Sequence, residues 1–166
     1  MPTGFRTALC GALVALFAAA SPAPAENAFA RGISDDTKYA IIAGVAATFA
    51  SSRTEGPERA ARMADATIIA ASVAEYLKPV LVVNSGGRFP SSHSAAAFAA
   101  AACLADTDPP RKWLYYLGAA LVGWSRVELG AHQWEDVVAG AALGIAVGNW
   151  SLTSKDGLLL ERVFKF

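Results

Sequence analysis

Alanine-rich apolar stretches are the feature of this sequence that most restricts its fold. Residues 94–104, for example, run Ser-Ala-Ala-Ala-Phe-Ala-Ala-Ala-Ala-Cys-Leu. Alanine has the highest intrinsic helix propensity, and no stretch alternates apolar and polar residues as a half-buried strand does. Hydrophobic residues make up 54% of the chain and charged residues only 17%, which excludes a disordered polar tail. The sequence therefore predicts a helical globular protein.

Short polar, proline or glycine joints divide the chain into about five helices, and 166 residues suit one domain. We expect the first helix to be capped by Ser34 or Asp35, and the second to kink or end near Pro79. The fold class is all-α, a single bundle with helices over about 34–51, 58–82, 90–104, 111–128 and 132–150. Most of the apolar runs are shorter than the roughly 20 residues that a membrane span needs. Core helices of a soluble bundle and short, tilted membrane helices both remain open.

The first residues have the pattern of an export signal. Arg6 supplies a positive charge, residues 8–20 are apolar, and Ala23-Pro24-Ala25 offers a small-residue cleavage site. We expect a signal peptide at 1–25 and the functional domain at 26–166, with an uncleaved anchor helix as the alternative. Either form predicts an exported protein, in the periplasm or on the periplasmic face of the inner membrane.

The charge balance and the cysteines exclude two classes of protein. Acidic and basic residues are equal at 14 each, so no excess of positive charge indicates a nucleic-acid partner. Two cysteines are too few for a disulfide scaffold. Cys103, in the alanine-rich stretch, is expected to be a small buried hydrophobe.

The chain has only two histidines, and the second lies in a chemically suggestive segment. Asp136 follows His132 by four residues, a spacing that puts both on one helix face. A carboxylate bonded to one ring nitrogen fixes the tautomer and presents the other nitrogen as a nucleophile or base. Arg126, on the other side of Gly130, offers a guanidinium with the geometry that phosphate prefers.

The first histidine, His93, lies at a predicted helix start. Pro90 sets the turn, and Ser91 and Ser92 are good helix caps. Backbone N–H groups at such a start bind anions, and His93 could protonate a leaving-group oxygen. Two histidines, an arginine and an anion-binding helix start together indicate phosphoryl transfer.

The two segments resemble signatures of the type 2 phosphatidic acid phosphatase (PAP2) superfamily, which includes the vanadium haloperoxidases. Residues 125–136 are similar to its third signature, Ser-Arg, five residues, His, three residues, Asp. Residues 90–93 resemble its second signature, Pro-Ser-Gly-His, with Ser92 at the glycine position. The first signature, Lys, six residues, Arg-Pro, is absent, and Lys78 and Arg88 are the candidates to replace it. The resemblance covers about residues 70–150.

The resemblance implies a metal-independent phosphatase that uses no cofactor and forms a phosphohistidine. His132 would attack phosphorus, Asp136 would hold its ring, and His93 would protonate the leaving group. Five residues would bind the phosphate: Arg126, Ser91, Ser92, Lys78 and Arg88. The implied substrate is a small-molecule or lipid-linked phosphomonoester or pyrophosphate, with possible association of the protein with the membrane.

Two other functions remain open at this point. His93, His132 and Asp136 could ligate zinc in a metal-dependent phosphohydrolase, although a nearby arginine would disfavour a cation. A non-catalytic helical envelope protein, a decayed relative, is the other alternative, and the absent first signature favours it.

Overall fold

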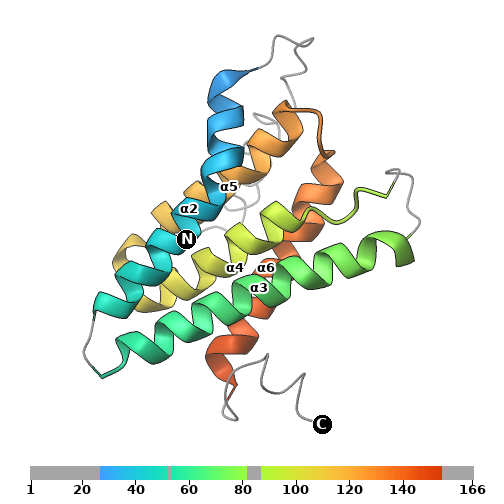
Figure 1. The fold of residues 1–166 in the computed structure, drawn as a ribbon. Coiled ribbons are helices and arrows are strands. Elements are labelled where there is room, and N and C mark those ends of the chain that lie inside the picture. The colour runs from blue at the N-terminus through green and yellow to red at the C-terminus, as the bar shows by residue number, and fades with distance from the viewer. Residues whose placement is uncertain (1–26, 52–53, 82–86, 155–166) are drawn as a thin grey trace, which may run out of the picture.

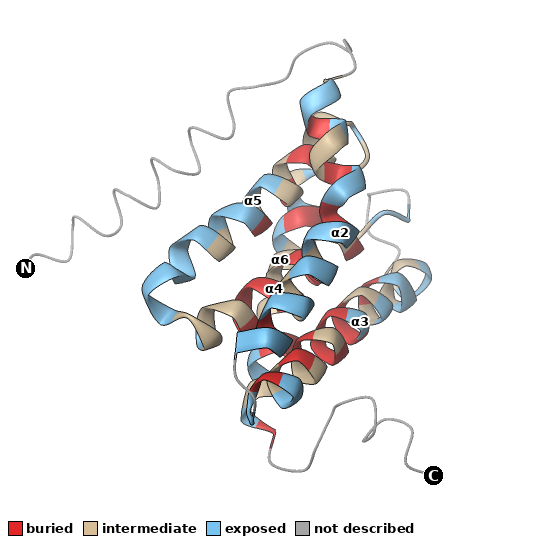
Figure 2. Ribbon diagram, turned by 60° about the vertical axis from the view of Figure 1, so that its left-hand side comes forward, coloured by how far each residue is buried: buried red, intermediate tan, exposed pale blue. Residues whose placement is uncertain are grey.

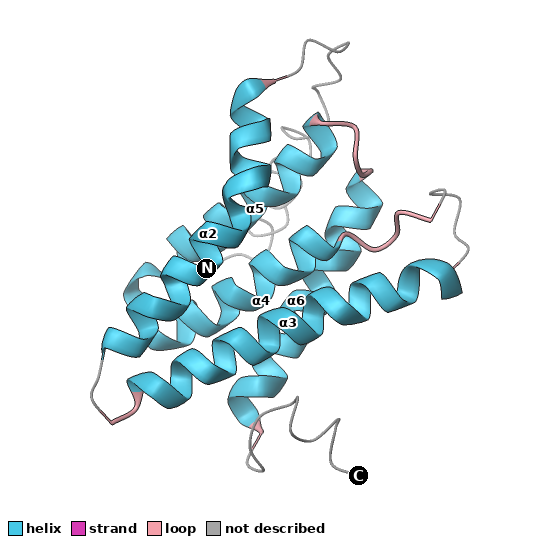
Figure 3. Cartoon of the chain, viewed as in Figure 1, coloured by secondary structure: helices cyan, strands magenta, loops and turns pink. Residues whose placement is uncertain are grey.

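The computed structural model describes residues 27–51, 54–81 and 87–154. The predicted signal peptide lies outside the described residues. The described part of the chain forms five α-helices and a short 3-10 helix, η1. In chain order they are α2 (Ala28–Ser51), α3 (Gly56–Val80), α4 (Ser92–Thr107), η1 (Pro109–Arg111), α5 (Lys112–Glu128) and α6 (Trp134–Thr153). These ranges contain no strand, so the predicted all-α bundle of about five helices is confirmed (Figure 1, Figure 3).

The alanine-rich helix α4 forms the centre of the bundle and packs against α2, α3, α5 and α6. Most of its residues are buried, as the colouring in Figure 2 shows. Its contact with α6 is unusually close because glycines of α6 face it. A Cβ added at Gly144 would lie 2.2 Å from the carbonyl oxygen of Ala95. Only glycine allows two backbones to approach this closely, so the distance between α4 and α6 is fixed by backbone contact.

The core lies where α3, α4 and α6 meet. Met63 is fully buried there, with alanines of α3 and α4 and Val147 of α6 around it. Cys103 is buried in the same cluster, and burial raises the pKa of its thiol to about 12. Its predicted role as a small buried hydrophobe is thereby confirmed. No helix in the described ranges is both long and apolar enough to cross a bilayer.

The start of the first helix was predicted wrongly. Helix α2 begins before Ser34, and its first N–H groups are capped by Asn27, whose Oδ1 accepts hydrogen bonds from Phe29 (3.1 Å) and Ala30 (3.3 Å). Ser34 and Asp35 therefore lie inside the helix. Asn27 is the second residue after the predicted signal segment, and an asparagine side chain caps a helix as well as serine does.

The start of the last helix also differs from the prediction. Helix α6 has Gln133 as its N-cap, so His132 precedes the helix and does not lie on it. The side chain of Asp136, in the first turn, reaches back to the N-cap backbone in a capping box. The pairing of His132 with Asp136 consequently crosses a helix terminus. The predicted end of the second helix near Pro79 is confirmed, since Pro79 lies in the last turn of α3.

Candidate active site

A tight turn after α5 fixes His132 relative to Arg126. Gly130 has a φ of +65°, a backbone conformation that glycine adopts without strain. The turn allows the N–H groups of Ala131 and His132 both to donate to the carbonyl oxygen of Arg126, at 3.0 and 3.1 Å. The imidazole and the guanidinium are therefore held on adjoining parts of one rigid turn.

His132 is oriented by a buried carboxylate. Its Nδ1 lies 3.3 Å from Oδ2 of Asp136, which also accepts a hydrogen bond from the N–H of Gln133 at 3.0 Å. Asp136 is only 1% exposed. With the proton on Nδ1, the ring donates to this carboxylate and presents the lone pair of Nε2. The geometry thus supplies a neutral imidazole with one nitrogen ready to act as a nucleophile.

The start of α4 is joined directly to this pair. Ser91 is the N-cap of α4, and its hydroxyl accepts a hydrogen bond from the N–H of Ser94 at 3.4 Å. The N–H of Ser91 donates to the carbonyl oxygen of Asp136 at 2.9 Å. Ser91 is fully buried, whereas Ser92 and His93 line a cavity. The two signature segments therefore meet at the contact between Ser91 and Asp136.

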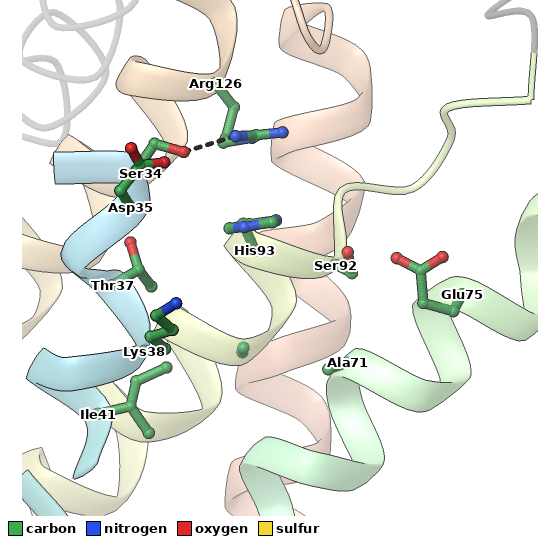
Figure 4. Close-up of a pocket in the computed structure, with 11 residues that line it drawn as sticks. Ser34, Asp35, Thr37, Lys38, Ile41, Ala71, Glu75, Ser92, His93 and Arg126 are labelled. Atoms are coloured by element: carbon green, nitrogen blue, oxygen red, sulfur yellow. Dashed lines mark hydrogen bonds between the residues drawn. The ribbon is translucent and has the colours of Figure 1, made fainter. Parts of the chain in front are cut away.

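The cavity has a volume of about 410 Å³, and helices α2, α3, α4 and α5 contribute to its lining. Figure 4 shows His93 between the side chains that come from α2 and Glu75 of α3, with Arg126 nearby. Arg126 donates from Nη1 to the hydroxyl of Ser34 at 2.5 Å. Its Nε is buried and has no hydrogen-bond partner among the described residues. A tetrahedral oxyanion in the cavity would supply the acceptor that this nitrogen lacks.

Burial and neighbouring cations lower the pKa of both imidazoles. Burial lowers the pKa of His93, and the charges of Arg126, His132 and Lys78 lower it further, while Glu75 raises it. Burial likewise lowers the pKa of His132, although its hydrogen bond to Asp136 opposes the change. Arg126 and Lys78 lower the pKa of both histidines, so the two rings lie within electrostatic range of the same two cations. His132 itself is buried and lies outside the lining of the cavity.

The two candidates for the missing first signature, Lys78 and Arg88, do not line the cavity. Lys78, in the last turn of α3, pairs with Glu75 at 2.5 Å between Nζ and Oε1. Hydrogen bonds from Lys78 and Ser92 lower the pKa of Glu75. Arg88 is exposed, and its Nη1 donates to the carbonyl oxygen of Gly130 at 3.3 Å. Phosphate binding by Lys78, Arg88 and the serines stays a prediction.

Sequence reasoning missed the contribution of α2 and of Glu75 to this cavity. Its lining includes a set of polar residues on α2: Ser34, Asp35, Thr37 and Lys38. A polar cluster near the start of a helix that is otherwise apolar is the signal that could have indicated them. No signal in the sequence connects Glu75 with Ser92, because their contact depends on the packing of α3 against α4.

The arrangement of His93, His132 and Asp136 does not match the predicted zinc site of the metal-dependent alternative. Within the described ranges, no three His, Cys, Asp or Glu side chains come together as a metal-binding group would. His93, His132 and Asp136 therefore do not form the three-ligand cluster that a zinc hydrolase requires.

In this all-α bundle, His93 and Arg126 line one cavity, and the buried pair of His132 and Asp136 is joined to the start of the helix that carries His93. A family model described as the PAP2 superfamily matches residues 64–158, and the chain belongs to this superfamily. It is a phosphatase of the PAP2 type. The predicted family is thereby confirmed.

Comparison with solved structures supports the fold. A crystal structure of Aquifex aeolicus LpxE matches with a TM-score of 0.61 and 22% sequence identity, over 81% of this chain and 89% of that chain. At this identity the likeness shows the fold alone. The sequence has no match among the curated proteins.

Proposed function

We propose that this phosphatase is metal-independent and hydrolyses a phosphomonoester or pyrophosphate through a phosphohistidine on His132. One observation carries the proposal: Nδ1 of His132 is bound by the buried carboxylate of Asp136, beside a cavity lined by His93 and Arg126. The carboxylate leaves Nε2 as the nucleophile, and the cavity supplies an acid and a guanidinium for the phosphate.

In the first step, the lone pair of Nε2 on His132 forms a bond to phosphorus. The bond from phosphorus to the leaving oxygen breaks, and the protonated ring of His93 donates its proton to that oxygen. Asp136 stabilises the positive charge that the His132 ring acquires. Arg126 donates to the phosphate oxygens, where negative charge is concentrated in the transition state.

In the second step, water attacks phosphorus and the nitrogen–phosphorus bond breaks. The ring of His93, now neutral, takes a proton from the water, so it returns to its starting state. The electron pair of the broken bond returns to Nε2 of His132, and phosphate leaves. Water is the co-reactant of the second step, and no metal ion is needed to balance either step.

The substrate that we propose is lipid-linked. An apolar cavity of about 240 Å³ is lined by α2, α4 and α5 and by Met63 of α3, and it shares Thr37 and Ile41 with the cavity that His93 lines. An apolar chain attached to a phosphate bound beside His93 could follow α2 into this second cavity. Large exposed apolar side chains on α2, including Phe29, Ile42 and Phe49, favour association with a membrane surface. Export to the periplasm remains part of this proposal.

Phosphate release from purified protein tests the mechanism. We expect release from para-nitrophenyl phosphate and from a lipid phosphate, activity that survives EDTA, inhibition by vanadate, and an acid-labile phosphoenzyme with radiolabelled substrate. His132→Ala should abolish release and labelling, whereas Glu135→Gln, an exposed neighbour, should change neither.

Three results would contradict the proposal. Release that persists in His132→Ala would exclude His132 as nucleophile, and loss of activity with EDTA would favour a metal-dependent enzyme. A folded wild-type protein inactive on both substrates would favour the non-catalytic alternative.

A further inference from the structure

Lys38 is a lysine that lines the cavity, although no motif includes it. It belongs to α2, and Figure 4 shows its side chain on the same side of the cavity as Ser34 and Asp35. Its Nζ lies 5.0 Å from the centroid of the Tyr39 ring, and the described residues hold no carboxylate in an ion pair with it. Lys78, the lysine that the family pattern favours, is bound to Glu75 and does not line the cavity.

The position of Lys38 is tied to that of Arg126. The guanidinium of Arg126 is hydrogen-bonded to Ser34, four residues before Lys38 on α2. Residues four apart lie on the same face of a helix, one turn from each other. Ser34 and Lys38 therefore lie on the same face of α2, and both line the cavity together with Arg126.

Charge balance shows what Lys38 adds. The lining contains two carboxylates, Asp35 and Glu75, and two permanent cations, Lys38 and Arg126. Lys78 neutralises Glu75 from outside the lining. Apart from the histidines, the remaining lining charges are one carboxylate and two cations, so Lys38 makes their sum positive. An anionic phosphate needs this excess, because Asp35 alone would offset Arg126.

We propose that Lys38 is a substrate-binding residue that contacts the phosphate oxygens together with Arg126. This inference rests on the proposed function and adds a cation from a helix outside the signature segments. A lysine ammonium is a compact point charge that binds phosphate without a fixed geometry. Its place on α2 also explains how the cavity could bind an anion although the first signature is absent.

The test measures binding of inorganic phosphate by calorimetry and the KM for para-nitrophenyl phosphate. Lys38→Met should weaken phosphate binding and raise KM about 10-fold, the loss expected for one charge-assisted contact. Lys38→Arg should retain most of the affinity because it keeps the charge. Lys112→Met, which removes an exposed lysine outside the cavity lining, is the matched control and should behave as wild type.

The outcomes separate this inference from the proposed function. Phosphate binding and KM in Lys38→Met equal to those of wild type would overturn the role of Lys38, even if His132→Ala abolished turnover. Weakened phosphate binding in Lys38→Met would support it, even if the wild-type protein released no phosphate from either ester. Wild-type protein that binds no phosphate would overturn it.

Discussion

Replacement of Gly140 by alanine tests whether close contact between α4 and α6 sets the geometry of the site. Gly140 lies one turn after Asp136 on α6, and its Cα faces Ser91, the cap of the helix that carries His93. A Cβ at this position would lie 2.3 Å from the carbonyl oxygen of Ser91 and 3.1 Å from Cβ of Ser94. Because that oxygen belongs to the backbone, no side-chain rotation relieves the clash.

The size of the effect follows from these distances. Ordinary van der Waals contact begins at 3.4 Å, so α6 and the start of α4 would have to separate by about 1 Å. Overpacking of this kind lowers the stability of the fold by about 1–3 kcal/mol. Alanine has a higher helix propensity than glycine, which stabilises the helix by about 1 kcal/mol. The net loss, up to about 2 kcal/mol, is smaller than the 5–15 kcal/mol that typically stabilises a domain. The variant should therefore fold.

Catalysis should suffer far more than stability. The separation would stretch the 2.9 Å hydrogen bond between Ser91 and Asp136 and move His93 relative to His132. A displacement of about 1 Å can reduce turnover about 100-fold. We expect kcat/KM on para-nitrophenyl phosphate to fall by about this factor, with a thermal midpoint, measured by circular dichroism, only a few degrees lower.

Gly32→Ala is the matched control. Gly32 also lies within a helix, but a Cβ there would have no neighbour within 4 Å. This variant should gain the helix-propensity benefit of about 1 kcal/mol and keep wild-type kcat/KM. Wild-type kcat/KM in Gly140→Ala would refute the reasoning, because the contact between α4 and α6 would then not determine the geometry of the site.

Three further predictions concern the charged and polar groups of the site. Asp136→Asn should lower kcat by orders of magnitude, up to about 10⁴-fold, because the amide favours the wrong tautomer of the imidazole; steady-state kinetics with an unchanged kcat would contradict that role. Burial and nearby cations lower the pKa of His93 below its ordinary value of 6.5, so the proton for the leaving group is present at acidic pH and lost as the pH rises. Between pH 5 and 8, roughly the range that brackets a histidine pKa, kcat/KM for an alkyl phosphate should fall more steeply than for para-nitrophenyl phosphate, whose leaving group needs no proton. His93→Gln should remove that difference, and a difference that persists in the variant would identify another acid. Ser34→Ala removes the hydroxyl that accepts a hydrogen bond from Arg126. It should lower the free energy of unfolding by about 1.5 kcal/mol, lower the thermal midpoint by about 3–6 °C and raise KM. An unchanged KM would show that this contact does not position the guanidinium.

The helices and the two signature segments could be predicted because they depend on near neighbours in the chain. Alanine favours the helix wherever it stands, and the pairing of His132 with Asp136 spans only four residues. The helix starts were less predictable. Helix α2 is capped by Asn27 and not by Ser34. Helix α6 begins with the capping box of Gln133 and Asp136, so His132 precedes the helix instead of lying on it.

By itself, the sequence determined an all-helical chain and the pairing of His132 with Asp136, since propensities, turns and signatures act over a few residues. Only the tertiary structure decided which side chains share the cavity. Ser34 and Arg126 are 92 residues apart, and α2 lies outside the matched range 64–158, so no motif indicates that it contributes Lys38. Such contacts arise from helix packing, which here depends on backbone approach at Gly140 and Gly144. Local sequence rules do not encode that approach.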